Sequence, residues 1–359
     1  MSKKQENKKI KLFLGAYVNF PNAQNINCDH IARYIDKDKF EVHTMYTDKM
    51  PINKSEYKQL GIHLHRLIHH RFIWYWCKWL TMFFGKYDIY YLPKREEMDE
   101  SISKLYRGKQ GVFVASVENV IEQQENNDAK FRDYFLKLMD HSFAISDCIA
   151  QTVKKYWNVD MPVLHLGIDP IEAQLKEKKE IKNIIWVGSL IERKRPLLLL
   201  ECAKKFQSIN FTMIGDGDVQ DIVKAEISKH NLTNVTLTGR IPNNEVYELM
   251  AKNDLLLMTS RNEGLPKVIQ EAALLGLPSI YIGECYDVDF IESGVNGIKV
   301  MDIEEMIEKI QFLLDNPQEL SQMSQHAIES VQDYLWPNLI KDYEEYFINI
   351  YNENKGKSV

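Results

Sequence analysis

The chain has 359 residues, of which 45% are hydrophobic, 27% charged and 11% aromatic. This composition excludes a disordered, collagen-like or disulfide-stapled protein, and at roughly 150 residues per domain the length predicts two domains. Five scattered cysteines without a CxxC pair indicate reduced thiols and no structural zinc. The sequence shows neither a signal-peptide pattern nor a run of the ~20 apolar residues that a membrane span needs, so we expect a cytoplasmic protein.

Positive charge is concentrated in the first half of the sequence. Residues 1–170 carry 25 Lys and Arg against 21 Asp and Glu, a net of +4, whereas the remaining residues carry 20 against 30, a net of −10. Within 49–95, nine basic residues are accompanied by only two acidic ones. A local basic excess suggests an anionic partner, such as a phosphorylated lipid or an acidic membrane surface, and a solvated basic surface is an equal alternative. No nucleic-acid partner is expected.

The first half alternates between short apolar runs and helical patterns. The expected strands cover residues 10–14, 41–45, 62–65, 88–92, 111–117 and 142–146. A helix is expected over about 24–35, with further helices between the later strands. The pattern predicts a Rossmann-like domain over 1–168, followed by a polar, charge-rich linker over 169–180.

Strands and helices alternate more regularly in the second half. The expected strands cover 183–188, 211–215, 235–239, 254–258 and 278–283. A first helix is expected to begin at Pro196, and three further helices are expected over 219–230, 243–251 and 266–275. Apolar strands alternating with helices predict a parallel sheet covered on both faces, here a second Rossmann-like domain over 181–335. Three glycines end strands at the edge where open α/β sheets bind ligands: Gly188, Gly215 and Gly239.

The last segment, 336–359, contains an amphipathic helix. Within 337–352, four apolar residues recur at helical spacing: Leu339, Tyr343, Phe347 and Ile350. We therefore expect this helix to pack against another element.

Several common ligand motifs are missing from the sequence. It contains no GxGxxG, no GxxxxGK[ST] and no GxSxG, which excludes the usual nicotinamide, P-loop and α/β-hydrolase sites. It does contain a loop directly after the strand 254–258, in which Glu263 precedes Gly264, Leu265 and Pro266 and Glu271 follows inside the next helix. A glycine-containing loop that enters a helix presents backbone N–H groups to a phosphate. Carboxylates on both sides of such a site suit the sugars of a nucleotide-sugar.

The sequence resembles the retaining family 4 glycosyltransferases, which have the GT-B fold. The resemblance is carried by Glu263 and Glu271, separated by seven residues within SRNEGLPKVIQEAALLGLP, and by WVGSLIERKR at 186–195. MIGDG at 213–217, LTGR at 237–240, IESGVNGI at 291–298 and VLHLGID at 163–169 follow the family pattern as well. The resemblance implies an α/β fold of two Rossmann-like domains facing a central cleft, with the C-terminal helix returning to the first domain.

The resemblance also implies roles for individual residues. Arg193 and Lys194 would hold the donor diphosphate, Glu263 would bind the transferred sugar, and Glu271 would bind the ribose. Further donor contacts are expected at Gly188, Ser189, Gly215, Gly239, Arg240, Gly264, Leu265 and Pro266. Family members often have Arg where Ser189 stands and His where Glu118 stands; Glu118 either takes the role of that His or is misaligned. The fold works without a metal, so no cofactor is expected.

An aromatic and basic segment lies within 66–86. It includes Trp74, Trp76 and Trp79 and is flanked by Arg66, Arg71, Lys78 and Lys86. Such a helix can lie at a bilayer interface, so contact with an anionic membrane is one interpretation, and burial in the core of the first domain is the other. The histidines nearby, His63, His65, His69 and His70, are expected to be surface or packing residues.

The resemblance, taken with these features, implies a retaining, metal-independent hexosyltransferase. It would move a sugar from a nucleotide-diphosphate donor, a UDP-sugar by preference, to a glycan or lipid-linked acceptor of the cell envelope, and would associate with the membrane only peripherally. A GT-B sugar-nucleotide epimerase and an inactive nucleotide-sugar-binding relative are the alternatives. No motif encodes the sugar, the base, the acceptor or the oligomeric state.

Overall fold

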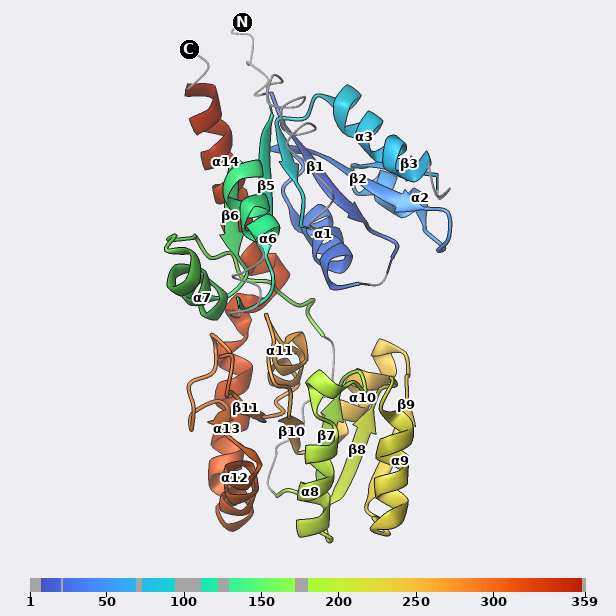
Figure 1. Cartoon of the computed structure of the whole chain (residues 1–359), viewed down its shortest axis with the longest axis vertical. Coiled ribbons are helices and arrows are strands. Elements are labelled where there is room, and N and C mark those ends of the chain that lie inside the picture. The colour runs from blue at the N-terminus through green and yellow to red at the C-terminus, as the bar shows by residue number, and fades with distance from the viewer. Residues whose placement is uncertain are drawn as a thin grey trace, which may run out of the picture. The chain divides into compact units, whose positions relative to one another are not determined.

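The computed structural model describes residues 8–20, 22–68, 73–93, 111–121, 129–171 and 180–356. It divides into two compact units (Figure 1). The first contains residues up to Gly167 together with Trp336–Val359, and the second contains Ile168–Leu335. The chain thus passes between the units twice, and a backbone bridge joins Ile168 to Leu335 at these two points. Most of the expected linker 169–180 lies outside the described residues.

The first unit contains a six-stranded parallel sheet in the order β3-β2-β1-β4-β5-β6. Its strands are β1 (Ile10–Tyr17), β2 (Phe40–Thr47), β3 (Ile62–Leu67), β4 (Ile89–Tyr91), β5 (Val112–Val117) and β6 (His141–Ala144). The central strands are buried almost continuously, as in a sheet covered on both faces.

Helices connect and cover the strands of this unit. They are α1 (Ala23–Tyr34), α2 (Lys54–Gln59), α3 (Ile73–Gly85), α6 (Ala129–Asp133), the π-helical turn η1 (Tyr134–Leu138) and α7 (Asp147–Trp157). Asn22 and Ser146 begin α1 and α7, because their side chains accept hydrogen bonds from Asn25 N and Ile149 N.

The C-terminal helix α14 (Trp336–Gly356) packs against α1 and β5 of the first unit, as its apolar spacing predicts. Tyr343 and Phe347 are fully buried, and burying each ring contributes about 1.5–3 kcal/mol. Glu344 adds polar contacts, since its carboxylate accepts from Asp36 N at 2.9 Å and from Lys39 Nζ at 2.8 Å. The end of the chain is thereby part of the first unit's core.

The second unit contains a six-stranded parallel sheet in the order β12-β11-β10-β7-β8-β9. Its strands are β7 (Asn183–Val187), β8 (Asn210–Ile214), β9 (Val235–Gly239), β10 (Leu255–Met258), β11 (Ser279–Ile282) and β12 (Ile298–Val300). Its helices are η2 (Glu192–Lys194), α8 (Leu197–Lys205), α9 (Gln220–Lys229), α10 (Asn243–Lys252), α11 (Lys267–Leu274), α12 (Ile303–Asp315), α13 (Pro317–Ser330) and η3 (Gln332–Tyr334).

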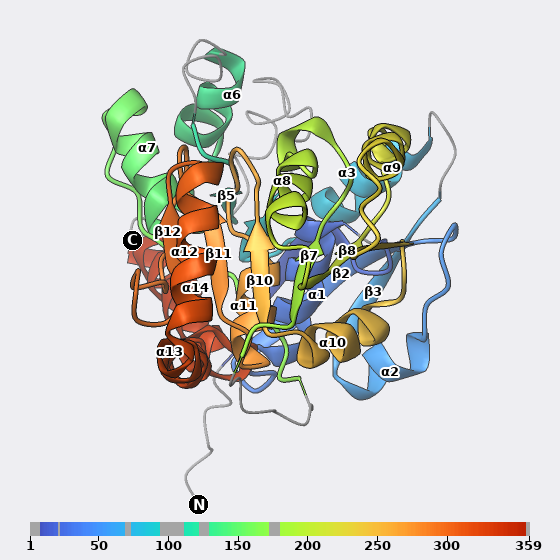
Figure 2. The same cartoon turned by 90° about the horizontal axis from the view of Figure 1, so that it is seen from below.

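These helices form a layer on each face of the second sheet (Figure 2). Helices α8, α9 and α12 cover one face, and α10, α11 and α13 cover the other. The core between the layers is built from fully buried residues such as Leu199, Phe211, Leu257 and Ile280. The expected strands and helices of this half are confirmed within a few residues at each end, and sequence analysis missed β12 and the two helices after it.

The two sheets have the same connectivity. When the strands of the second unit are numbered from β7, its order reads 3-2-1-4-5-6, which is also the order of the first unit. In this topology the connections reverse direction between the first and fourth strands, and ligands bind at the carboxyl ends of the strands at that point. In the second unit, the point lies between β7 and β10.

Candidate active site

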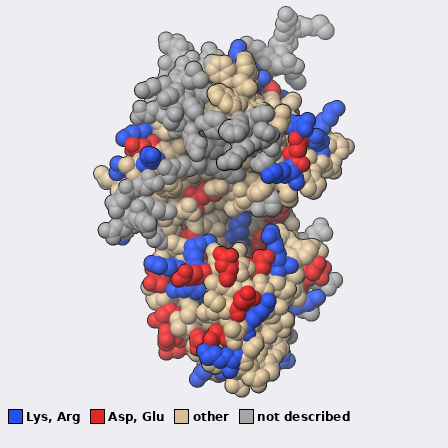
Figure 3. Space-filling model, turned by 45° about the vertical axis from the view of Figure 1, so that its right-hand side comes forward, with Lys and Arg blue, Asp and Glu red and all other residues tan. Residues whose placement is uncertain are grey.

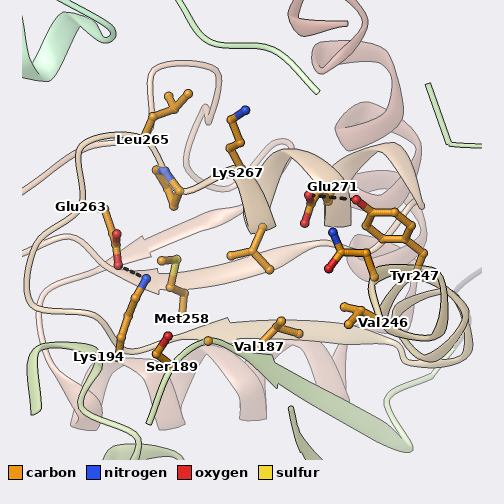
Figure 4. A pocket seen from close by; sticks show the side chains of 14 residues that line it. Val187, Ser189, Lys194, Val246, Tyr247, Met258, Glu263, Leu265, Lys267 and Glu271 are labelled. Atoms are coloured by element: carbon orange, nitrogen blue, oxygen red, sulfur yellow. Dashed lines mark hydrogen bonds and ion pairs between the residues drawn. The ribbon is translucent and has the colours of Figure 1, made fainter. Parts of the chain in front are cut away.

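A pocket of about 300 Å³ lies at this reversal point, at the carboxyl ends of β7 and β10 (Figure 4). It lies entirely within the second unit. Fourteen residues line it: Val187, Gly188, Ser189, Lys194, Asn243, Val246, Tyr247, Met258, Glu263, Leu265, Pro266, Lys267, Val268 and Glu271. The lining therefore combines an apolar floor with two carboxylates and two lysines.

The short helix η2 brings cations to one side of the pocket. Two hydrogen bonds join it to the segment after β10: Thr259 Oγ1 donates to Lys194 O at 2.8 Å, and Arg261 N donates to Arg193 O at 2.9 Å. Trp186 Nε1 in turn donates to Thr259 Oγ1 at 3.0 Å. Arg195, whose backbone is left-handed at φ 47°, donates from its guanidinium to the backbone oxygens of Thr259 and Ser260. These bonds fix the backbone that carries Arg193 and Lys194.

Glu263 lies against both cations. Lys194 Nζ donates a hydrogen bond to Glu263 Oε1, and Arg193 Nη1 lies 3.2 Å from Glu263 Oε2. Arg193 Nη1 also donates to Asn262 O at 2.5 Å. The side chains of Glu263 and Lys194 are only 10% and 17% exposed, whereas that of Arg193 is 45% exposed. Two positive charges and one negative charge thus leave this side of the pocket with a positive balance.

Glu271 occupies the opposite side, inside α11. Its Oε1 accepts a hydrogen bond from Tyr247 Oη at 3.2 Å, as Figure 4 shows. Burial raises the pKa of the Glu271 carboxyl to about 7, although the bond from Tyr247 and the charge of Lys267 act in the opposite direction. The carboxylate is therefore costly to keep ionised in the protein alone and suited to accept hydrogen bonds from a ligand.

Close backbone packing surrounds the strand ends beside the pocket. Gly215 has φ 138°, and a Cβ at this position would lie 1.9 Å from Gly188 O. Gly217 has φ 153°, and its Cβ would lie 2.5 Å from Leu190 O. Only glycine fits both positions, so the MIGDG segment holds the loop after β7 in place.

The structure places the predicted donor residues in two groups. Seven line the pocket: Gly188, Ser189, Lys194, Glu263, Leu265, Pro266 and Glu271. Arg193 adjoins it through Glu263. Four others are not among the lining residues: Gly215, Gly239, Arg240 and Gly264. Arg240 is exposed, and Gly215 and Gly239 are joined by a backbone hydrogen bond of 3.0 Å.

Glu118 belongs to the first unit, directly after β5. Ser116 Oγ donates to its Oε1 at 2.9 Å, and Tyr91 Oη donates to Ser116 Oγ at 2.9 Å. The carboxylate thus ends a short hydrogen-bonded chain at the carboxyl edge of the first sheet. Its assignment as the counterpart of the family histidine stays a prediction.

Three residues that shape the site were not predicted from the sequence. Tyr247 reaches Glu271 from α10, and Lys267 places a further cation at the start of α11. Arg195 fastens η2 to the end of β10. The run of three basic residues at 193–195 was visible in the sequence, but only the conformation of η2 shows which of them contact the pocket residues.

The positive charge at the pocket is local. Basic and acidic side chains are interspersed over the face of the second unit that Figure 3 shows. Residues 168–335, which make up this unit, carry 17 Lys and Arg against 27 Asp and Glu, a net charge of −10. Attraction of an anion to this unit must therefore come from the cations at the pocket itself and not from a broad field.

The aromatic segment 66–86 was expected either to contact a membrane or to be buried in the core, and its side chains are partly buried and partly exposed. In α3, Trp79 and Met82 are buried, at 7% and 0% exposure, whereas Trp76, Leu80 and Phe84 are 65%, 50% and 71% exposed. Lys78 is buried, and Arg66 pairs with Asp48 at 2.9 Å. Arg71, His69 and His70 lie outside the described residues, and the side chain of Trp74 is not described either. Within the described residues, no helix is long and apolar enough to cross a membrane.

Comparison with known proteins finds glycosyltransferases. Residues 168–330 match the model of the family "Glycosyl transferases group 1". An uncharacterized glycosyltransferase of Methanocaldococcus jannaschii is 26% identical over 229 residues, which cover 61% of this chain and 64% of the relative. The putative teichuronic acid biosynthesis glycosyltransferase TuaC of Bacillus subtilis is 26% identical over 55% of this chain and 49% of its own length. The chain thus spans about half to two thirds of the length of these curated relatives.

The fold has a close counterpart among solved structures. The crystal structure of Anabaena HepE in complex with UDP matches 95% of this chain and 100% of that chain, with a TM-score of 0.76 at 16% sequence identity. At this identity the likeness shows the fold, and that fold is the two-domain GT-B architecture expected from the sequence. Residues 168–330 thus match the glycosyl transferase group 1 family, and the chain has the GT-B fold.

Proposed function

We propose that this chain is a retaining glycosyltransferase that transfers a hexose from a UDP-sugar without using a metal ion. The observation that carries the proposal is the arrangement of Glu263 and Glu271 on opposite sides of one pocket, with cations beside Glu263. A nucleotide-sugar has two sets of sugar hydroxyls separated by a diphosphate. The pocket offers matching groups in the same order.

The diphosphate is assigned to the space between η2 and the start of α11. The N-terminus of a helix offers unpaired N–H groups and the positive end of its dipole, and Lys194 and Lys267 add full charges to the lining. Charge develops on the phosphate as the glycosidic bond breaks, so fixed cations stabilise the transition state more than the ground state. Local cations can supply this stabilisation without a metal.

The two carboxylates are assigned to different sugars. Glu271 accepts hydrogen bonds from the ribose hydroxyls, and the hydrogen bond from Tyr247 orients its side chain for that task. Glu263 contacts the transferred hexose, and its ion pairs with Arg193 and Lys194 hold it in place while these cations also contact phosphate. Val187, Val246 and Met258 give the pocket an apolar wall.

Retention at the anomeric carbon follows from the family resemblance of the Glu263 and Glu271 motif. In a front-face reaction the acceptor hydroxyl attacks from the side that the diphosphate leaves, and a phosphate oxygen takes the hydroxyl proton. The bond from the anomeric carbon to the phosphate oxygen breaks as the bond to the acceptor oxygen forms. The protein's part is to position the two reactants and to stabilise the leaving diphosphate.

The acceptor is proposed to be a cell-envelope glycan or a lipid-linked sugar, bound by the first unit. Support comes from the curated relative named for teichuronic acid biosynthesis and from the basic excess of residues 49–95. The exposed apolar side chains of α3 suit contact with a membrane surface, which would bring the enzyme to a lipid-linked acceptor.

A product assay tests the proposal. After a thermal-shift screen of UDP-, GDP-, ADP- and CMP-sugars, the purified chain is incubated with the best donor, with and without membrane-extracted acceptors. A donor at 100 times its dissociation constant should add about 2.7 kcal/mol of stability. Nucleoside diphosphate released together with an α-linked product from an α-linked donor, unchanged by EDTA, supports the proposal. An isomerised donor without acceptor would identify an epimerase, and binding without any product would identify an inactive relative.

A further inference from the structure

Three histidines and a glutamate lie together on one face of the first unit's sheet. Strands β2 and β3 are parallel neighbours, with His43 opposite His63 and Met45 opposite His65. Because alternate residues of a strand point to the same face, Glu41 and His43 share the face that holds His63 and His65. Neighbouring strands thus contribute an E-x-H and an H-x-H pair to one surface.

The side chains of this cluster are in direct contact. His43 Nε2 lies 3.0 Å from Glu41 Oε1, and His43 Nδ1 lies 3.0 Å from His65 Nε2. His63 stacks on His43, with 4.6 Å between ring centroids and 16° between ring planes. One possible ligand atom from each of Glu41, His43 and His63 lies within 4.8 Å of the other two.

We propose that Glu41, His43 and His63 bind a divalent transition-metal ion of the Zn²⁺ type in the first unit. Imidazole nitrogen and carboxylate oxygen are ordinary ligands of Zn²⁺, at about 2.0–2.2 Å, so the ligand atoms of a tetrahedral site lie roughly 3.3 Å apart. His43 and Glu41 already meet this spacing, and rotation of the exposed His63 side chain closes the third side. A water molecule completes the coordination from the solvent side.

His65 and Tyr87 supply the outer contacts of such a site. With the metal on His43 Nε2, the ring proton of His43 resides on Nδ1 and is donated to His65 Nε2. Tyr87 Oη lies 3.2 Å from the same nitrogen and helps to hold the ring of His65 in place. Without the metal, the proton of His43 resides on Nε2 and bonds Glu41.

Two further observations favour metal binding at this position. Among the described residues, the imidazole of His63 takes part in no hydrogen bond or ion pair, so both of its nitrogens are available. Glu41 already attracts a cation, since Lys11 Nζ lies 3.3 Å from its Oε1. The lysine side chain is partly exposed and can turn into solvent when a divalent ion takes its place.

The location indicates a structural role for the metal. Glu41 and His63 lie near the amino-terminal ends of β2 and β3, whereas parallel sheets bind substrates at the carboxyl ends. β3 is the edge strand of the sheet, and the metal would join it to β2. An ion bound only by the folded chain stabilises the fold by mass action, so the site should affect unfolding more than turnover.

Metal titration of the full chain, freed of metal by a chelator, tests this proposal. We expect the wild-type protein to bind one equivalent of Zn²⁺ by calorimetry, and Co²⁺ to give the visible absorption of a tetrahedral complex. His63→Ala and Glu41→Gln should each weaken Zn²⁺ binding more than about 100-fold, and His65→Ala should weaken it about 10–100-fold. Lys11→Met should tighten binding, because it removes the competing cation. Zn²⁺ should raise the unfolding temperature of wild type but not of His63→Ala.

A matched control is His230→Ala. His230 is also an exposed histidine next to a carboxylate, Glu226 at 3.1 Å, but it belongs to no three-ligand cluster within the described residues. This variant should bind Zn²⁺ as the wild type does. If the wild type binds no stoichiometric Zn²⁺, or if His63→Ala and Glu41→Gln bind it with wild-type affinity, the cluster is a metal-free hydrogen-bonded network and the proposal is wrong. Because His63 is exposed, its replacement leaves the core intact.

Discussion

Both units contain a sheet of six parallel strands in the same order, and they differ in which end of the strands carries a cluster of polar side chains. In the second unit Lys194 and Glu263 follow the carboxyl ends of β7 and β10. In the first unit the polar cluster of Glu41, His43 and His63 lies in the amino-terminal part of β2 and β3. One topology thus carries a ligand pocket in one unit and a candidate structural site in the other. Side chains and loops, and not strand order, decide what each sheet does.

The comparison extends to how the apolar surface is covered. In the second unit, one face of the sheet and the helices α8, α9 and α12 enclose a core of buried apolar residues. In the first unit, α3 buries Trp79 and Met82 but leaves Trp76, Leu80 and Phe84 exposed. Large apolar side chains that share one exposed helix face indicate contact with a partner or a membrane. This difference fits the proposal that the second unit binds the donor and that the first unit contacts the surroundings of the acceptor.

The largest expected effect concerns Lys194. If the second unit stabilises the leaving diphosphate with fixed cations, Lys194→Ala should lower kcat by at least about 100-fold, as the loss of one preorganised charge contact does. The matched control is Lys204→Ala, which removes a lysine paired with Glu201 on the surface of α8. Steady-state kinetics with a saturating donor measures both. A loss below about threefold in Lys194→Ala would mean that the diphosphate binds elsewhere.

The second prediction separates the two carboxylates. Glu271→Ala should weaken binding of bare UDP about 10–100-fold, because charge-assisted hydrogen bonds to the ribose are lost. Glu263→Ala should leave UDP affinity at or above the wild-type level, since it frees Arg193 and Lys194 for phosphate, and should reduce turnover instead. Calorimetry with UDP and kinetics with the UDP-sugar distinguish the two. Equal loss of UDP affinity in both variants would refute the division of roles.

The third prediction uses the pKa of Glu271 in the free protein. Because the folded pKa is raised to about 7, the folded state holds the proton more tightly than the unfolded state. The free-energy cost of ionising Glu271 is absent below the ordinary pKa of about 4.3, grows between there and 7, and reaches about 4 kcal/mol above pH 7. Glu271→Gln should therefore raise the unfolding temperature by several degrees at pH 8 and leave it nearly unchanged near pH 4.

Thermal unfolding across pH checks this, with Glu245→Gln on the exposed side of α10 as the control. The control should show no such pH-dependent gain. A gain for Glu271→Gln that is as large at pH 4 as at pH 8 would mean that packing, and not the buried charge, causes it.

The sequence predicts the strands well because each is a short apolar run bounded by turn residues, as in β7 and β10. It also predicts the Glu263 and Glu271 pair, since both belong to one loop and helix. It does not reveal that Tyr247 meets Glu271, because that contact joins two helices. The contact between His43 and His63 is not evident from the sequence for a similar reason, because it depends on the register between two neighbouring strands.

The smallest expected effect concerns α3 and a membrane surface. Trp76, Leu80 and Phe84 are spaced four residues apart, so they lie along one side of the helix, and all are at least half exposed. Lys78 is buried and Arg66 is paired with Asp48, so the charge attraction is weaker than four free basic residues would give. Each basic residue near the surface of an anionic membrane contributes about 1 kcal/mol to binding.

We expect weak binding to anionic vesicles that salt reduces but does not abolish, with a blue shift of Trp fluorescence. Replacing Trp76 and Phe84 by Ser should remove it, whereas Phe312→Ser, at an exposed apolar position of α12, should not. Absence of binding to anionic vesicles at low salt would leave the exposed side of α3 for a protein partner.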